Sequence, residues 1–139
     1  MTEIIDQLLA HPVGVLVGYF SVAILALIVY LSCFEWVTKY NCWKEIQKGN
    51  VAAAMATGGK IFGICNVMRF SIDSNTSVYG MLKWSFIGFL LLLAAYLLLE
   101  FLTPVFSIDE EISKDNRAVG LIVLIITVSL SFVIGASIN

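Results

Sequence analysis

The residue with the clearest capacity for chemistry is Lys60, because it stands inside an otherwise uncharged stretch from Val51 to Met68. A central lysine in an apolar helix costs about 2.5–3.5 kcal/mol on insertion scales, and such residues usually pair with a carboxylate or line a wet pathway. Glu35 and Glu100 are each flanked by apolar residues. The three side chains could bind a cation, relay a proton, or lock a helix bundle.

The glutamates also have a simpler interpretation as residues of the membrane–water interface. Trp36, Tyr40 and Trp43 follow Glu35 closely. A belt of tryptophan and tyrosine is typical of that interface, where a glutamate can reach water. Glu35 and Glu100 would then take no part in a pathway.

Two adjacent stripes at helical spacing run along the segment that contains Lys60. The first predicts close approach of another helix, since small side chains let two backbones pack tightly in lipid. Its members are Gly49, Ala52, Ala56, Gly59 and Gly63. The second gathers polar groups beside it and consists of Asn50, Ala53, Thr57 and Lys60.

Asn50 has a counterpart in Asn116, and two roles suit them. Asn41, and Ser107 three residues before Glu110, are typical helix N-caps. If helices begin there, both asparagines lie in the third turn and hydrogen-bond to a neighbouring helix. The alternative is that each asparagine caps the apolar segment after it.

Other kinds of chemistry lack their residues. No nucleophile stands with a base, His11 is the one histidine, and Cys33, Cys42 and Cys65 form no cluster with it that suits a metal. No glycine-rich loop follows a strand, and no basic patch suggests nucleic acid. We therefore expect no enzymatic activity, no cofactor and no metal.

The elements that must position these residues are membrane helices. The chain has 139 residues, of which 60% are hydrophobic and 13% charged. About 20 apolar residues cross the hydrocarbon core as a helix. Four blocks reach or approach that length, and they predict an all-α membrane protein with four spans: 12–33, 51–68, 84–99 and 118–138.

A repeated motif organises these spans. "EIQKGNVA" at 45–52 matches "EISKDNRA" at 111–118, and "EWVTK" at 35–39 resembles "EFLTP" at 100–104. We infer a single membrane domain, 1–139, that contains two tandem two-helix hairpins, 12–70 and 83–138. Because both hairpins enter the membrane in the same direction, they should be related by an axis along the membrane normal.

Loop charge and the two stripes predict orientation and assembly. Five Lys or Arg residues lie in the two loops that carry the motif, against two on the opposite side, which favours both termini outside the cytoplasm. The two stripes face different directions, so we expect a homo-oligomer in which a second copy covers one of them. Gly59 and Gly63 should then lie at or beside the subunit contact.

The motif "TKYNCWKEIQKGNVAAA" and its second copy "TPVFSIDEEISKDNRAVG" resemble the YjfL-like family of small bacterial inner-membrane proteins, domain of unknown function 350. The second copy departs from the family pattern at Asp115 and Gly120. The resemblance covers nearly the whole chain. It implies a place in the inner membrane among lipids, and a grouping with envelope-maintenance and stress-response proteins as partners. It implies no reaction.

Two classes of function follow. The first is a non-enzymatic, oligomeric membrane component that serves envelope maintenance or stress response. The alternative is a small ion channel or proton-coupled transporter that uses Lys60, Glu35, Glu100, Asn50 and Asn116. Polar side chains on one continuous wet face would favour the alternative, and enclosed polar side chains would favour the first.

Overall fold

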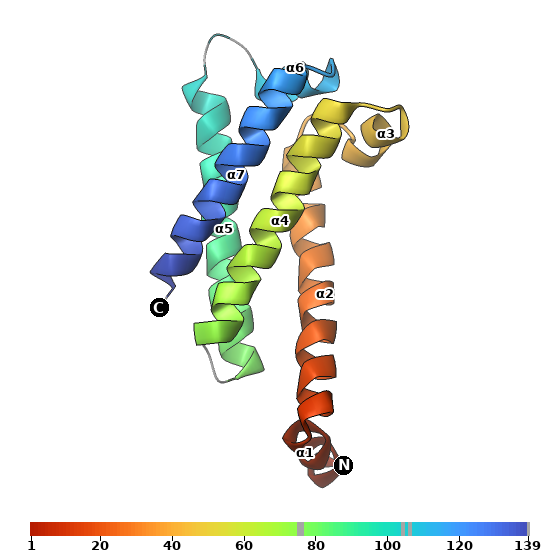
Figure 1. The fold of residues 1–139 in the computed structure, drawn as a ribbon, viewed down its shortest axis with the longest axis vertical. Helices are drawn as coiled ribbons and strands as arrows, with labels where there is room; N and C mark the ends of the chain where they lie inside the picture. Colours follow the sequence, from red (N-terminus) through yellow and green to blue (C-terminus); the bar gives the residue numbers. More distant parts are fainter. Residues whose placement is uncertain (75–76, 104, 106, 139) are drawn as a thin grey trace.

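The computed structural model describes residues 1–74, 77–103, 105 and 107–138, without the side chains of 8 and 9. Every regular element in these ranges is a helix, as Figure 1 shows. In chain order they are α1 Thr2–Ala10, α2 Pro12–Val37, α3 Cys42–Gln47, α4 Val51–Ser74, α5 Val78–Leu102, α6 Ile108–Ser113 and α7 Arg117–Ser137. The predicted all-α fold is confirmed.

Four of these helices, α2, α4, α5 and α7, are long and apolar enough to cross a membrane. They have 26, 24, 25 and 21 residues, and at 1.5 Å per residue each covers the roughly 30 Å hydrocarbon core. The four predicted spans are thus confirmed. Because α2 and α5 continue beyond the uncharged blocks, Glu35 and Glu100 lie in their last turns.

Helix α4 is the central element of the bundle. More of its span is buried than of any other spanning helix, and it packs most extensively on α7 and then on α5 (Figure 1). Close approach to α7 depends on small residues. A Cβ added at Gly120 of α7 would lie 2.7 Å from the Cα atom of Ala52, and one added at Gly59 would lie 3.0 Å from that of Leu124.

The small-residue stripe therefore packs within one chain. Gly63 faces Leu92 of α5 and Thr127 of α7. We predicted that Gly59 and Gly63 lie at a subunit contact because their face of α4 would otherwise be uncovered. That argument is wrong, because α7 of the same chain covers this face. Gly49 is not a member of the packed stripe, since it precedes α4 and is exposed, and a Cβ added there would meet nothing within 4 Å.

The short helices α3 and α6 lie at the same end of the bundle, away from both termini (Figure 1). Asn41 and Ser107 cap them as expected, each accepting a hydrogen bond from a backbone N–H three residues on. Both helices then stop at a residue with left-handed backbone, Gly49 with φ +88° and Asp115 with φ +58°. The chain turns there instead of continuing into the next span.

That turn decides the roles of the two asparagines. Asn116 is the N-cap of α7, and Asn50 accepts a hydrogen bond from the N–H of Ala53 in the same way. Their placement in a third helical turn was wrong, because it ignored the left-handed residue before each. Both side chains also donate to a glutamate five residues earlier, Glu45 or Glu111. The two motif copies thus share local geometry, while the predicted axis between hairpins stays a prediction.

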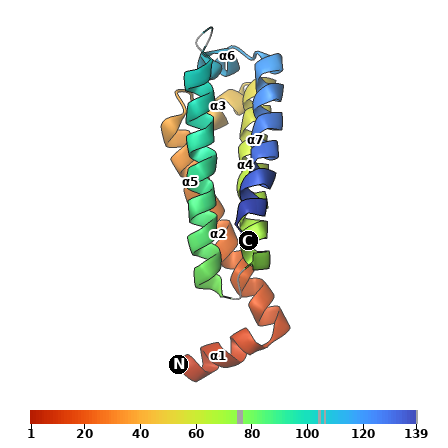
Figure 2. The same cartoon turned by 90° about the vertical axis from the view of Figure 1, so that its left-hand side faces the viewer.

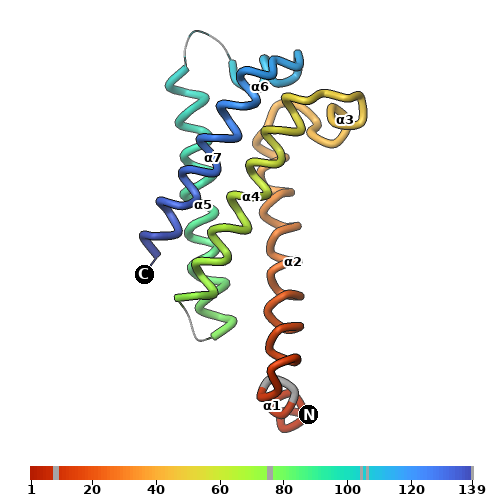
Figure 3. Tube along the Cα trace, viewed as in Figure 1, coloured from red at the N-terminus to blue at the C-terminus, as the bar shows by residue number. Residues whose placement is uncertain are grey.

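The N-terminal part of the chain adds a helix that we had not predicted. Helix α1 turns sharply away from α2 (Figure 2), and its Ile4 and Ile5 are exposed. His11 caps α2 through its Nδ1 atom, which accepts from the N–H of Val13 at 3.3 Å. The first part of α2 extends past the ends of α4 and α5, as the trace in Figure 3 shows.

Candidate functional site

Lys60 lies enclosed in the bundle, with 1% of its surface exposed. Three aromatic rings surround its ammonium. The distances from Nζ to the ring centroids are 4.5 Å for Tyr96, 5.4 Å for Phe34 and 5.9 Å for Tyr40. An ammonium within about 6 Å of a ring centroid is attracted by the negative face of the ring, most strongly where water is excluded. The rings therefore replace part of the lost hydration of Lys60.

Helix direction explains how Lys60 reaches these rings. Side chains on a helix tilt toward its N-terminus, and the N-terminus of α4 lies at the end that carries α3 and α6 (Figure 1). The ammonium accordingly meets Tyr40, which belongs to the connection between α2 and α3. The ammonium of Lys60 therefore lies closer to that end of the bundle than the Lys60 backbone does.

Two of these rings, Phe34 and Tyr96, belong to a packed aromatic core between α2 and α5. Phe34 meets Tyr96 edge to face, with centroids 5.9 Å apart, and Phe89 in the same manner at 5.6 Å. Phe89 also stacks on Tyr30 at 4.5 Å. These contacts hold Phe34 and Tyr96 in one orientation toward Lys60.

Asp109, in the first turn of α6, is the buried carboxylate of this site. It is 4% exposed. The hydroxyl of Tyr96 donates to its Oδ1 atom at 2.5 Å, and the backbone N–H of Lys39 donates to Oδ2 at 3.2 Å. Tyr96 therefore touches both charges, the ammonium with its ring and the carboxylate with its hydroxyl.

Sequence reasoning missed Asp109. It stands beside Ser107 and Glu110, where an acidic residue is ordinary in the first turn of a helix. Its counterpart in the first motif copy is Trp43, so the repeat did not single it out. The hydrogen bonds that bury Asp109 come from Tyr96, 13 residues away in the sequence, and from Lys39, 70 residues away.

A direct ion pair with Glu35 or Glu100 was one of the alternatives for Lys60, and the described residues do not form it. Among the described residues, no carboxylate oxygen lies within 4.0 Å of its Nζ atom, and this atom has no hydrogen-bond partner. Lys60 is enclosed by rings rather than locked by a direct salt bridge.

The two glutamates differ in their surroundings. Glu100 accepts a hydrogen bond from the hydroxyl of Ser107 at 2.7 Å, while its other oxygen is buried without a partner in the described part of the chain. Glu35 is half-buried. Its side chain lies on the wall of a cavity of about 10 Å³ that Lys60 also lines.

Two further hydroxyls near Lys60 resemble it in lacking partners. Thr57 Oγ1 and Tyr40 Oη are buried, with no hydrogen bond to any described residue. Burial, together with the nearby Cys42 and Asp109, raises the pKa of Tyr40 well above its ordinary value, so the phenol keeps its proton. Thr57 lines the same small cavity as Lys60, one turn before it on α4.

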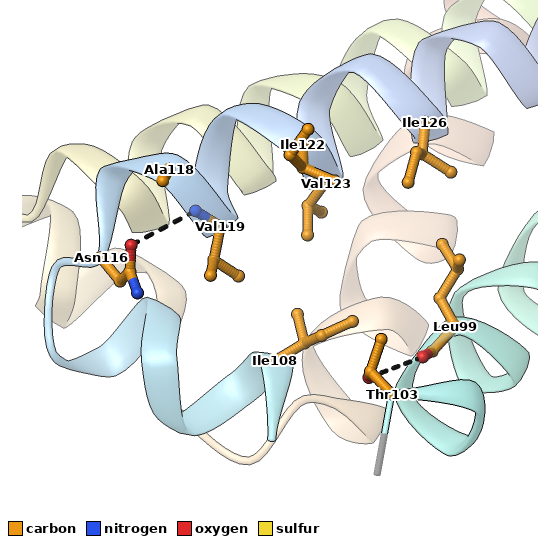
Figure 4. A pocket seen from close by; sticks show the side chains of 9 residues that line it. All are labelled: Leu99, Thr103, Ile108, Asn116, Ala118, Val119, Ile122, Val123 and Ile126. Atoms are coloured by element: carbon orange, nitrogen blue, oxygen red, sulfur yellow. Dashed lines mark hydrogen bonds between the residues drawn. The ribbon is translucent and has the colours of Figure 1, made fainter. Parts of the chain in front are cut away.

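The remaining sequence-predicted residues lie apart from this site or support it. Asn50 joins the start of α4 to α6, because its side-chain N–H also donates to the carbonyl of Ile112 at 2.8 Å. Asn116 lies at one end of an apolar pocket of about 230 Å³ between α5, α6 and α7, which Figure 4 shows. Lys60 is not among the residues that line that pocket. The described residues contain no group of His, Cys, Asp or Glu that could hold a metal ion.

Four apolar helices around an enclosed interior define a multi-pass membrane protein. The chain belongs to the family described as Domain of Unknown Function (DUF350), whose model matches residues 7–138. It is also 55% identical over 121 residues to the UPF0719 transmembrane protein YshE of Bacillus subtilis (strain 168). The match covers 87% of this chain and 90% of that protein. No solved structure matches. The family expected from the paired motifs is confirmed.

Proposed function

We propose that this chain is a non-enzymatic component of the bacterial cytoplasmic (inner) membrane, with both termini outside the cytoplasm. It assembles with further copies of itself among membrane lipids and serves envelope maintenance or stress response, together with other proteins of the envelope. The family supports a role without a known reaction, and the enclosed interior supports a packed component rather than an open conduit.

The observation that carries this proposal is the enclosure of the polar side chains. Lys60, Thr57 and Asn50 are all buried, and the cavity beside Lys60 measures only about 10 Å³. Deeper in the bundle, Asn66 donates to Ser131 at 3.0 Å and ties α4 to α7. A conduction path needs a continuous water-filled passage lined by polar side chains. These side chains instead contact packed neighbours.

A second candidate is a small channel or proton-coupled transporter. It is favoured by four buried polar atoms that have no hydrogen-bond partner among the described residues: Tyr40 Oη, Thr57 Oγ1, Lys60 Nζ and Glu100 Oε2. Each such atom costs about 1–3 kcal/mol. Buried polar groups that are costly to keep in a membrane are often those that move ions or protons.

Reconstitution into liposomes separates the two candidates. Proton and cation flux would be measured with the wild-type protein, with Lys60→Ala, and with empty liposomes. We expect the same low flux in all three. A flux that requires the wild-type protein and falls to the empty-liposome level in Lys60→Ala would overturn the packed-component proposal in favour of transport.

The cellular role is tested in a strain that lacks the gene. We expect slower growth than the parent strain under membrane-damaging detergent or antibiotic, restored by the wild-type gene. Equal growth of the deletion and parent strains under these stresses would contradict a role in envelope maintenance.

A further inference from the structure

We propose that the cavity beside Lys60 is a binding site for one water molecule, and that this water and Glu35 form a proton path to the Lys60 amine. The site is independent of whether the protein transports anything. It would serve the second candidate function as an entry for protons, and in a packed component it would set the charge state of Lys60.

The cavity is about the size of one water molecule, and three of the residues that line it carry polar side chains: Glu35, Thr57 and Lys60. Its volume of about 10 Å³ is close to the smallest that holds one water molecule, which also needs two to four polar partners. Lys60 and Thr57 line it, and each has a buried polar atom without a partner in the described ranges. Glu35 lines the cavity as well. A water here would give the Lys60 and Thr57 atoms a partner and bring both within reach of Glu35.

Glu35 is the residue that joins this cavity to the outside. It also lines a groove of about 460 Å³ on the surface of α2, together with Ser32 and the largely exposed Trp36. A tryptophan at this end of a spanning helix marks the membrane–water interface. Glu35 therefore lies between a groove that opens near the interface and the small cavity at Lys60.

The proton transfer balances without any further reactant. A protonated Glu35 gives its proton to the water, and the water passes one of its own protons to the neutral Lys60 amine. The products are the Glu35 carboxylate, an unchanged water and the Lys60 ammonium. The rings of Phe34, Tyr40 and Tyr96 then face the new charge.

The other ionisable groups near Lys60 come from α3, α5 and α6. Cys42 of α3 lines the cavity, and Tyr96 of α5 carries the nearest ring. Asp109 of α6 accepts a hydrogen bond from the Tyr96 hydroxyl, and the ring of Tyr40, before α3, also faces Lys60. Asp109 is held by two hydrogen bonds and is not among the residues lining the cavity. It is a fixed counter-charge, whereas Glu35 is the exchanging group.

The test is nuclear magnetic resonance of the full chain in lipid nanodiscs, with nitrogen-15 at lysine Nζ. Lys60→Met identifies the Lys60 signal by its loss. We expect magnetisation transfer from water to the Lys60 Nζ protons in the wild-type protein. Glu35→Gln and Thr57→Val should each slow proton exchange at Lys60 by about tenfold, the effect of losing one good hydrogen bond. Thr57→Ser keeps the hydroxyl and should exchange as wild type.

Glu100→Gln is the matched control, because Glu100 is the motif counterpart of Glu35 and does not line the cavity. Its exchange rate at Lys60 should equal that of the wild type. No water contact at Lys60 in the wild-type protein would overturn the site. Unchanged exchange in Glu35→Gln, or an equal slowing in Glu100→Gln, would overturn the path through Glu35.

Discussion

At the scale of single residues, Asp109 offers the sharpest prediction. Replacing it with alanine removes the acceptor for two donors, the buried Tyr96 hydroxyl and the part-buried Lys39 N–H. Each donor then loses a hydrogen bond to a charged group, so we expect Asp109→Ala to lower the free energy of unfolding by about 2–4 kcal/mol. Thermal unfolding in mild detergent, followed by circular dichroism, measures the change.

The neighbouring Glu110 supplies the control for Asp109. Its side chain is exposed, so Glu110→Ala should change the free energy of unfolding by no more than about 0.5 kcal/mol. Tyr96→Phe keeps the ring over Lys60 and removes only the hydroxyl. It should therefore lower the free energy of unfolding by less than Asp109→Ala does. Equal stability of Asp109→Ala and Glu110→Ala would contradict the role assigned to Asp109.

At the scale of elements, the contact between α4 and α7 depends on Gly120. A methyl group there would press on the Cα atom and carbonyl oxygen of Ala52, at 2.7 and 2.8 Å. Backbone atoms cannot rotate away as a side chain can, so the helices must separate. We expect Gly120→Ala to cost about 1–3 kcal/mol of unfolding free energy, as overpacking usually does.

Gly58 provides a matched substitution on the partner helix. It lies within α4, and a Cβ added there would meet nothing within 4 Å. Since alanine is a better helix former than glycine, Gly58→Ala should raise the unfolding free energy by up to about 1 kcal/mol. If both alanine variants unfold at the same temperature in the same detergent, close packing at Gly120 is not the reason for its glycine.

At the scale of the whole molecule, the charges of the loops predict its orientation. The end with α3 and α6 carries the basic loops, and both termini lie toward the other end (Figure 1). A green fluorescent protein fused after Asn139 should stay dark, because it does not fold properly when exported unfolded. A fusion truncated after Lys48 should fluoresce. The reverse pattern would contradict the orientation with both termini outside.

Self-association is a second prediction at this scale, with α2 as its surface. Of the four spans, α2 has the smallest buried share. We expect native mass spectrometry from nanodiscs to give a dimer or a larger assembly. Phe20→Ala on α2 should shift it toward monomer, whereas Val133→Ala on α7, where the side chain is equally exposed at 63%, should not. A monomeric wild-type protein would contradict self-association.

Much of this architecture follows from the order of residues alone, because a bilayer leaves few choices. Apolar blocks of about 20 residues must cross as helices that satisfy their own backbone groups, so the four spans could be counted directly. The cost of a charge in lipid singled out Lys60 before its neighbours were known. The caps at Asn41 and Ser107 were predictable too, since they depend only on residues within one turn.

The surroundings of those residues required the tertiary structure. Lys60, Tyr96 and Asp109 come together only because α4, α5 and α6 have particular rotations about their axes. Helical spacing in the sequence predicts which residues share a face of a helix, but it does not predict which other helix packs against that face. The same limit placed Gly59 and Gly63 at a subunit contact, although α7 covers them within the chain. Local patterns determine elements, and contacts between distant elements determine the site, because the free energy of packing depends on all the helices together.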